Sequence, residues 1–317
     1  MKLEPKLEIS SFSLEDIILE ILQDSSYPIL ETDLLEKIRE YVPRATNTNM
    51  ESSLEILRKK GYDIKEISHG TSKLYTLVRF FEISSEELYR ITGTLELPAI
   101  ITSDFHFGSK NCYRKAFDLM LEDVHKYNIK SMTIAGDLLQ GVGVFRGESQ
   151  ELEIPEIGAQ IDGLVDILKN FKDISFHIVL GNHEEPVKSI AGLDPLKVLS
   201  SMLDDCYYYG HVGMLKIKDL YKYMMFHGQA ISRTTSYPIE KIWDGLLEKP
   251  NILHTAHTHQ KCIIQFEWNK WGILSGTLQR TNSYLLQKGL NAKEGWYILK
   301  DISDKGLDII DRTLRVS

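Results

Sequence analysis

The chain has 317 residues, of which 43% are hydrophobic and 26% charged, and its formal net charge is −8 at pH 7. These values are ordinary for a soluble globular protein, and the length suits one large domain plus a small one. The negative net charge argues against a surface that coats a polyphosphate broadly, so any nucleic-acid contact must be local. The three cysteines lie far apart without CxxC spacing, and no stretch reaches the length of a membrane span. We therefore expect a cytoplasmic protein.

Residues 12–79 show the order helix, helix, helix, hairpin. Pro43 and Gly61 are suitable ends for the second and third helices, and residues 62–78 alternate in a β-like manner around a short turn. Three helices followed by a hairpin is the order of a winged helix-turn-helix. The stretch LRKKGYDIKEISHGTSKLYTLV (57–78) resembles the recognition helix and wing of such domains.

Charge is unevenly distributed over this region. Residues 1–40 carry four Lys/Arg against ten Asp/Glu, whereas residues 41–79 carry seven against four. The positive half is the half that would face DNA, because phosphate contacts supply most of the affinity. DNA is thus the expected partner, with a protein-contact or packing module as the alternative. The candidate DNA contacts are Arg44, Arg58, Lys59, Lys60 and Lys73.

The remainder of the chain predicts a second, larger domain. We expect a winged helix-turn-helix domain over residues 1–80, a linker over 81–98 and an α/β domain over 99–317. Strands and helices alternate from Ala99 onward, and the pattern becomes strand-rich after His259. The predicted helices of this domain cover residues 113–127, 156–170, 194–203 and 238–248.

Five short polar fragments follow strand-like apolar stretches in this domain. They are DFH at 104–106, GD at 136–137, GNHE at 181–184, His227, and HTH at 257–259. Side chains delivered from successive strand ends meet at the carboxyl edge of an α/β sheet. A pair of metal ions about 3.5–4 Å apart at such an edge can activate a water and clamp the oxygens of a phosphoryl group.

The candidate ligands of this site combine nitrogen and oxygen donors without a thiolate. Such a set suits two divalent ions, with Mn²⁺ first and Fe or Zn²⁺ as alternatives, and suits Mg²⁺ less because of its many imidazoles. His183, beside a ligand, is interpreted as a general acid that protonates a leaving oxygen, with Glu184 to orient or tune it. The candidate ligands are Asp104, His106, Asp137, Asn182, His227, His257 and His259.

The order DxH, GD, GNHE, H and HxH resembles the calcineurin-like metallophosphoesterase superfamily over about residues 99–285. The resemblance implies a four-layer α/β/β/α sandwich, in which two mixed sheets pack face to face between helical layers. It also implies His183 as the acid of the transition state. By the same resemblance one metal would be held by Asp104, His106, Asp137 and His259, and the other by Asp137, Asn182, His227 and His257.

Residues 136–152, 161–164 and 274–281 resemble the exonuclease (small) subunit of archaeal D-family DNA polymerase, which is itself similar to double-strand-break repair nucleases. The chain departs from that pattern at Gln140, where the family has an acidic residue, and at Ala256, where it has a glycine. The oligonucleotide-binding barrel expected before the core cannot fit into residues 80–98. A stand-alone relative of that subunit fits better.

Three functions remain open from the sequence. The first is a DNA nuclease, exonuclease or endonuclease, acting on single strands or ends, with Arg146, Arg280 and Tyr284 as candidate substrate contacts. The second is a phosphatase or nucleotide phosphodiesterase for a small molecule or phosphoprotein. The third is a non-catalytic DNA-binding or assembly subunit. His254 lies close to the HTH fragment but is left outside the ligand set.

Overall fold

The computed structural model describes residues 13–25, 29–59, 62, 64–69, 72–77, 88–142, 144, 150–228, 234–282, 285–286 and 291–314. The predicted contacts Lys60, Arg146 and Tyr284 lie outside these residues. The chain divides into two compact units, residues 1–83 and 84–317. Among the described helices, none has the length and apolar character needed to cross a membrane.

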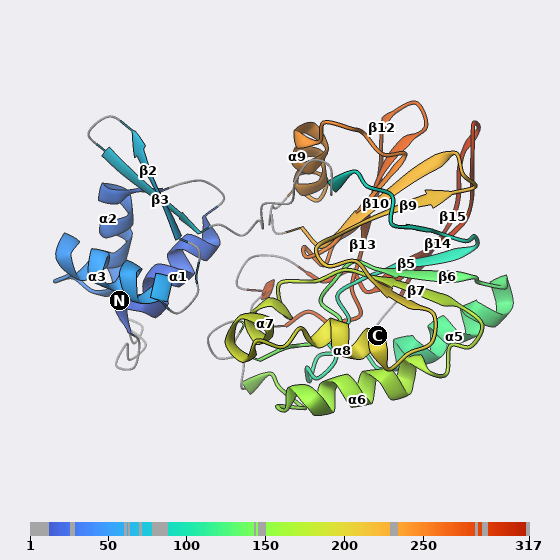
Figure 1. Cartoon of the computed structure of the whole chain (residues 1–317), viewed down its shortest axis with the longest axis horizontal. Coiled ribbons are helices and arrows are strands. Elements are labelled where there is room, and N and C mark those ends of the chain that lie inside the picture. The colour runs from blue at the N-terminus through green and yellow to red at the C-terminus, as the bar shows by residue number, and fades with distance from the viewer. Residues whose placement is uncertain are drawn as a thin grey trace, which may run out of the picture. The chain divides into compact units, whose positions relative to one another are not determined.

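The described part of the first unit contains three helices and a small antiparallel sheet (Figure 1). Ser13 caps the first helix through a reciprocal capping box with Asp16, which satisfies backbone donors at the helix start. The predicted order of three helices and a hairpin is found, with one extra short strand, β1, paired to β3. The assignment as a winged helix-turn-helix stays a prediction. The elements are α1 (Leu14–Asp24), β1 (Ile29–Leu30), α2 (Glu31–Tyr41), α3 (Asn47–Lys59), β2 (Ile64–His69) and β3 (Ser72–Leu77).

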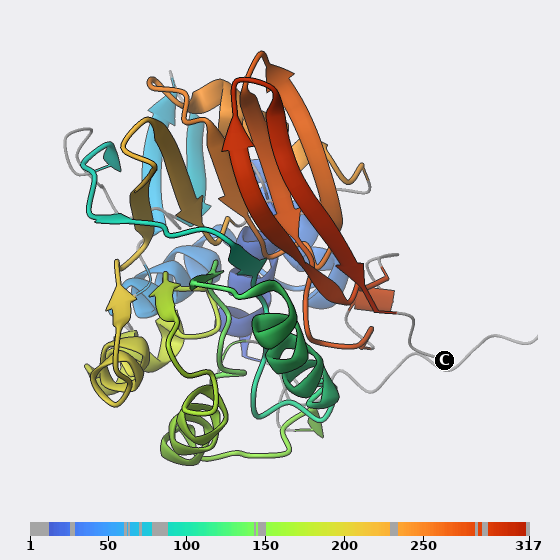
Figure 2. The ribbon, with the colours of Figure 1, turned by 90° about the vertical axis from the view of Figure 1, so that its right-hand side faces the viewer.

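Two six-stranded mixed sheets form the centre of the second unit. One has the order β15-β14-β5-β6-β7-β8, and its strands β5 to β8 run parallel. Its strands are β5 (Ala99–Thr102), β6 (Ser131–Ile134), β7 (Ser175–Ile178), β8 (Cys206–Tyr208), β14 (Gly295–Ser303) and β15 (Gly306–Thr313). Figure 2 shows the long β14–β15 hairpin, in orange-red and red, at one edge.

The other sheet has the order β12-β13-β11-β10-β9-β4, and β10, β11 and β13 run parallel within it. Its strands are β4 (Gly93–Thr94), β9 (Val212–Ile217), β10 (Tyr221–Phe226), β11 (Ile252–Thr255), β12 (Lys261–Glu267) and β13 (Lys270–Ser275). The short strand β4 lies within the segment expected to be a linker and pairs with β9.

Helices cover the outer faces of both sheets, so the unit is an α/β/β/α sandwich (Figure 1). Ile239 and Trp243 of α9 (Tyr237–Gly245) pack on the sheet that contains β10. Between the sheets lies a second core, to which β5 contributes Ile101 and β10 contributes Tyr223. The sheet that contains β5 is covered by α5 (Lys115–Tyr127), α6 (Ile157–Leu168) and α8 (Pro195–Ser201).

The sequence predicted α5, α6, α8 and α9 of this sandwich to within a few residues and missed several other elements. α7 (Glu185–Ala191) follows the GNHE fragment directly and has only seven residues. β8, β9 and β15 were also not predicted. β15 consists of half-buried and exposed residues at a sheet edge, so it lacks the continuous buried run that marks β5 and β6.

A buried carboxylate ties α5 to the β14–β15 hairpin. Asp123 Oδ2 accepts hydrogen bonds from the Trp296 indole nitrogen at 3.0 Å and from Arg312 Nε at 2.7 Å, and Asp123 is buried. Replacement by alanine leaves both donors without this acceptor. We expect Asp123→Ala to lower the free energy of unfolding by about 3 kcal/mol in denaturant titrations followed by circular dichroism. The control Asp118→Ala, at an exposed position of the same helix, should change it by less than about 0.5 kcal/mol. Equal effects of the two variants would contradict the buried-acceptor role.

Candidate metal centre

The predicted ligands follow five strands drawn from both sheets. Asp104 and His106 come after β5, and Asp137 comes after β6. Asn182 follows β7 in the same sheet, whereas His227 follows β10 and the HTH fragment follows β11 in the other sheet. The structure brings all seven side chains together, because the carboxyl ends of these parallel strands meet at one end of the sandwich.

The backbone of this centre is unusual at five of the seven predicted ligands. Each of these residues has a positive φ, a conformation that costs a side-chain-bearing residue roughly 1–3 kcal/mol and clusters at functional sites. Hydrogen bonds from distant segments hold the turns, as in the Asp104 carbonyl, which accepts from Thr277 Oγ1 at 2.8 Å. The φ values are 50° for Asp104, 48° for His106, 51° for Asp137, 73° for His257 and 53° for His259.

One group of ligands surrounds the Asp104 carboxylate. Its Oδ1 lies 3.3 Å from His259 Nε2, and the Nε2 atoms of His106 and His259 are 3.0 Å apart. Burial favours the protonated acid, yet the neighbouring histidines hold the pKa of Asp104 well below its usual range. Oδ1 has no hydrogen-bond partner within the part of the chain that the structure describes. A buried anionic oxygen with no donor is the environment that a cation fits.

A second group of ligands centres on His227. Its Nδ1 donates to the Ala135 carbonyl at 2.7 Å, so in the neutral ring Nε2 carries the lone pair. That Nε2 faces two acceptors, Asp137 Oδ2 at 3.0 Å and Asn182 Oδ1 at 2.9 Å. His257 Nδ1 also approaches Asn182 Oδ1, at 2.8 Å. Burial favours the neutral ring, but the Asp137 charge outweighs it and raises the pKa of His227 to about 10. The oxygens of Asp137 and Asn182 therefore form a site that strongly favours a positive charge.

Asp137 lies between the two groups. Its Oδ2 is 3.0 Å from His227 Nε2 and 3.8 Å from His106 Nε2. Three overlapping sets of donors, each with its ligand atoms within 4.8 Å of one another, run across the centre. They are Asp104–His106–His259, His106–Asp137–His183 and Asp137–His227–His257. This continuous row of donors fits a pair of metal ions that share Asp137.

His183 reaches the same carboxylate from the rim. Its Nε2 lies 3.9 Å from Asp137 Oδ2, and its backbone N–H donates to Asp137 Oδ1 at 2.9 Å. Its Nδ1 donates to the Gln140 carbonyl at 2.7 Å, which leaves Nε2 as the atom that faces the centre. The side chain is 12% exposed, so a reactant can reach it.

Glu184 bonds through its carboxylate to the backbone of two loops. Its carboxylate accepts from the backbone N–H groups of Leu139 and Gly181, each at 2.9 Å, and it is fully buried. Burial and the charge of Asp137 raise the pKa of Glu184 to about 8. Glu184 therefore joins the loop after β6 to the loop after β7. Its orienting or tuning of His183 stays a prediction.

Two glycines permit this crowding. A Cβ atom on Gly136, which has φ +85°, would lie 2.7 Å from His227 Nδ1. One on Gly181 would lie 2.1 Å from Asp137 Oδ1. Gly136 thus allows a close approach of the backbone to His227, and Gly181 allows the same approach to Asp137 within the GNHE fragment.

Several contributors to the centre were missed by sequence reasoning. Ser103 Oγ donates toward Asp104 Oδ2 and also lies 2.8 Å from Ser275 Oγ. Leu278 N–H donates to the Asp104 carbonyl at 3.0 Å. Ser275 and Leu278 come from a segment about 170 residues away in the chain, and a single serine gives no signal of such a contact.

Arg280 is the described member of the three candidate substrate contacts. It is exposed, its backbone N–H donates to the Asn111 carbonyl at 2.9 Å, and its guanidinium carbon lies 4.6 Å from the centre of the Tyr113 ring. The contact with the Tyr113 ring holds the guanidinium of this exposed residue in place.

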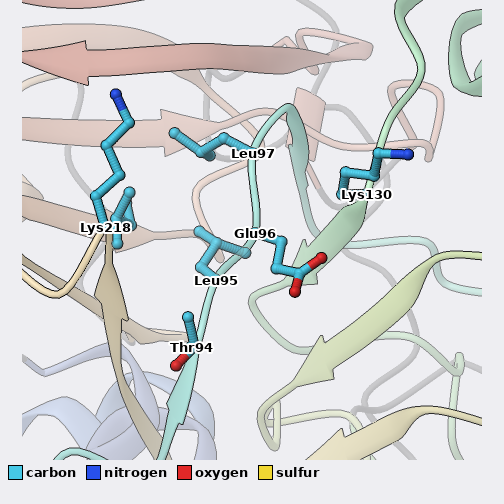
Figure 3. A pocket seen from close by; sticks show the side chains of 7 residues that line it. Thr94, Leu95, Glu96, Leu97, Lys130 and Lys218 are labelled. Carbon is cyan, nitrogen blue, oxygen red and sulfur yellow. The ribbon is translucent and has the colours of Figure 1, made fainter.

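A surface cavity of about 400 Å³ is lined by residues other than the predicted ligands, among them Lys130 and Lys218 (Figure 3). Lys130, one of its lining residues, precedes β6, whereas Asp137 follows that strand. The two lysines that line it are already engaged, Lys130 with Asn128 Oδ1 at 3.0 Å and Lys218 with Asp301. The cavity contains none of the predicted ligands, so we do not assign it to the reaction.

Known proteins are similar to this chain over parts of their length. The DNA polymerase II small subunit of Pyrococcus horikoshii is 37% identical over 98 residues, which are 27% of this chain and 16% of that protein. The one of Archaeoglobus fulgidus is 24% identical over 269 residues, covering 68% of this chain and 53% of that protein. The chain thus spans about half or less of the length of these relatives.

Among solved structures, the Pseudomonas putida nuclease MPE has 14% identity and a TM-score of 0.34, covering 70% of this chain and 90% of that chain. Vps29 of Chaetomium thermophilum has 11% identity and a TM-score of 0.38, covering 68% and 94%.

The family model described as calcineurin-like phosphoesterase matches residues 97–288, more than half of the chain. The matched range includes every residue of the candidate metal centre, from Asp104 to His259. On this match, and with the α/β/β/α sandwich and the row of His and Asp donors in place, the chain belongs to the calcineurin-like phosphoesterase family.

Proposed function

We propose that this protein is a dinuclear metal-dependent phosphodiesterase that cleaves DNA, as an exonuclease or endonuclease on single strands or ends. The observation that carries the proposal is the row of buried donors at the strand ends, with the reachable imidazole of His183 at its rim. The relatives named DNA polymerase II small subunit support a nucleic-acid substrate.

The donor set suits two divalent ions, with Mn²⁺ first and Fe or Zn²⁺ as alternatives. When bound, such a pair activates a water and neutralises charge on the phosphoryl oxygens. We assign Asp137 to both ions, because it lies between the two groups. The first ion is assigned to Asp104, His106, Asp137 and His259, and the second to Asp137, Asn182, His227 and His257.

His183 is assigned the proton transfer. The Gln140 carbonyl fixes its Nδ1 proton, so Nε2 is the atom that gives a proton to the departing oxygen. The hydrogen bond from its backbone N–H to Asp137 keeps the ring beside the reacting group. His183 thus acts on the leaving group, while the buried carboxylates and imidazoles hold the ions.

Residues outside the metal centre would bind the phosphates of the DNA. The exposed Arg280 guanidinium, fixed over Tyr113, is suited to a non-bridging phosphate oxygen. We assign residues 1–80 as a winged helix-turn-helix that adds further phosphate contacts. Lys59 and Lys73 pair with Glu55 and Glu51 at exposed positions, and such surface pairs yield easily to a phosphate. Arg58 Nε donates to the Ile64 carbonyl at 2.8 Å, so this arginine also joins α3 to β2.

The deciding experiment is degradation of DNA labelled at the 3′ or the 5′ end, single- and double-stranded, with Mn²⁺. We expect the wild type to cleave and His183→Ala to cleave at least about 10²-fold more slowly, as for loss of a general acid. His125→Ala, at an exposed histidine of α5, serves as the matched control and should retain activity. If the wild type leaves every DNA intact yet hydrolyses a chromogenic monoester or diester, the substrate is a small molecule or phosphoprotein instead.

Metal content separates the role of the shared carboxylate from that of the acid. Asp137→Ala should lose bound metal, because both ions depend on this residue. His183→Ala should keep two ions per chain in elemental analysis after dialysis against Mn²⁺. Two ions retained by Asp137→Ala would disprove the shared-ligand assignment.

The role of the first unit is tested by deletion and by charge. Removal of residues 1–80 should weaken DNA binding while hydrolysis of a small chromogenic diester stays nearly unchanged. Lys59→Ala in the full chain should reduce the slope of log K against log salt for duplex DNA by about 0.9, the value for one lost phosphate contact. Lys37→Ala, in the acidic part of the same unit, is the control and should leave the slope unchanged. Undiminished DNA affinity after deletion would identify a protein-contact module.

A further inference from the structure

Three buried polar side chains form a hydrogen-bonded chain across the two sheets. Thr133 Oγ1 of β6 lies 2.8 Å from the Tyr223 hydroxyl of β10, which lies 2.8 Å from His254 Nδ1 of β11. All three residues are fully buried. Since β6 belongs to one sheet and β10 and β11 to the other, this polar chain spans the core between the sheets.

The polar chain joins the strands that lead to one set of ligands. Thr133 lies four residues before Asp137, Tyr223 four before His227, and His254 three before His257. Asp137, His227 and His257 are one of the three donor sets in the centre. A second link lies closer to the ions, where His227 Nδ1 donates to the Ala135 carbonyl at 2.7 Å. The two links connect the same two sheets at successive levels behind the donors.

Apolar side chains of the core between the sheets surround most of the polar chain, and His254 also lies within range of the charges of Asp104 and His227. The core between the sheets contains Ile101, Met225, Ile252 and Ile273, and burial lowers the pKa of His254 to about 3, so its ring is neutral. Apolar side chains of similar size would fill this space without any need for matched donors and acceptors. Unlike apolar contacts, hydrogen bonds are directional. They therefore fix the relative position of the strands that they join.

We propose that Thr133, Tyr223 and His254 are positioning residues that set the spacing between the strand ends carrying Asp137, His227 and His257. This inference rests on the proposed metal centre. Bound metals have ligand distances that agree within about 0.2 Å, and loss of a hydrogen bond made to a ligand itself costs about 10- to 100-fold in metal affinity. A polar chain one step behind the ligands is expected to have an effect at the lower end of this range. The polar chain acts through the strands and touches neither substrate nor metal.

The same unit contains a matched pair for comparison. The Tyr209 hydroxyl lies 2.8 Å from His177 Nδ1, the same kind of bond at the same length. His177 belongs to β7, which leads to Asn182, but Tyr209 follows β8, which leads to no predicted ligand. The Tyr209–His177 bond therefore holds local structure without joining two ligand-bearing strands.

The test compares Tyr223→Phe with Tyr209→Phe in the full chain. Each variant removes one hydroxyl and keeps the ring. Mn²⁺ is titrated into metal-free protein in a calorimeter, and the melting temperature is measured with and without Mn²⁺. We expect Tyr223→Phe to weaken at least one Mn²⁺ binding event by about 10-fold or more and to reduce the rise in melting temperature caused by Mn²⁺. Tyr209→Phe should lower the melting temperature of the metal-free protein but keep wild-type Mn²⁺ affinity.

Thr133→Val breaks the polar chain at its other end with almost no change in volume, and it should also weaken Mn²⁺ binding. It keeps the inference testable if Tyr223→Phe does not fold. If Tyr223→Phe and Thr133→Val fold and bind Mn²⁺ with wild-type affinity, the inference is wrong. It is also wrong if Tyr209→Phe loses as much Mn²⁺ affinity as they do. Failure of the wild type itself to bind two Mn²⁺ ions would instead overturn the proposed metal centre.

Discussion

The burial of two carboxylates among histidines is the constraint on which the rest of the second unit depends. Asp104 and Asp137 lie almost fully inside the protein, where a charge without a counter-charge is strongly unfavourable. Imidazole nitrogens lie within 4 Å of each carboxylate and can supply this counter-charge. One of these imidazoles belongs to His227, whose pKa is raised to about 10. The closely spaced strand ends, the strained turns and the two crowded glycines all serve to bring these donors together.

This constraint also explains why the centre is assembled from both sheets. One sheet supplies both carboxylates, Asn182 and His106, whereas the other supplies His227, His257 and His259. Neither sheet alone supplies the full set of seven candidate ligands. Two further contacts fix the distances between the loops that carry the donors. The Glu184 carboxylate accepts hydrogen bonds from Leu139 and Gly181, and the Ala135 carbonyl accepts one from His227.

The candidate ligands could be selected from the sequence because each parallel strand appears as an apolar run that ends just before a polar fragment. The structure brings these side chains close together. The sandwich followed from the resemblance carried by those same fragments, and the family match and the two sheets confirm it. The positive φ values of Asp104 and His106 left no mark in the sequence, because they are imposed by contacts from elsewhere. For the same reason, the contacts of Ser103 with Ser275 and of Asp104 with Leu278 could not be foreseen.

The supply of donors from both sheets has a consequence for folding. Asp104 and His259 are separated by more than 150 residues of chain, so a cation held between them would close a very long loop and join the two halves of the sandwich. Any ligand that binds only the folded form stabilises it in proportion to the logarithm of its concentration over its dissociation constant. The metal concentration would therefore set the free energy of unfolding as well as the catalytic rate. A chelator would act on this protein partly as a denaturant.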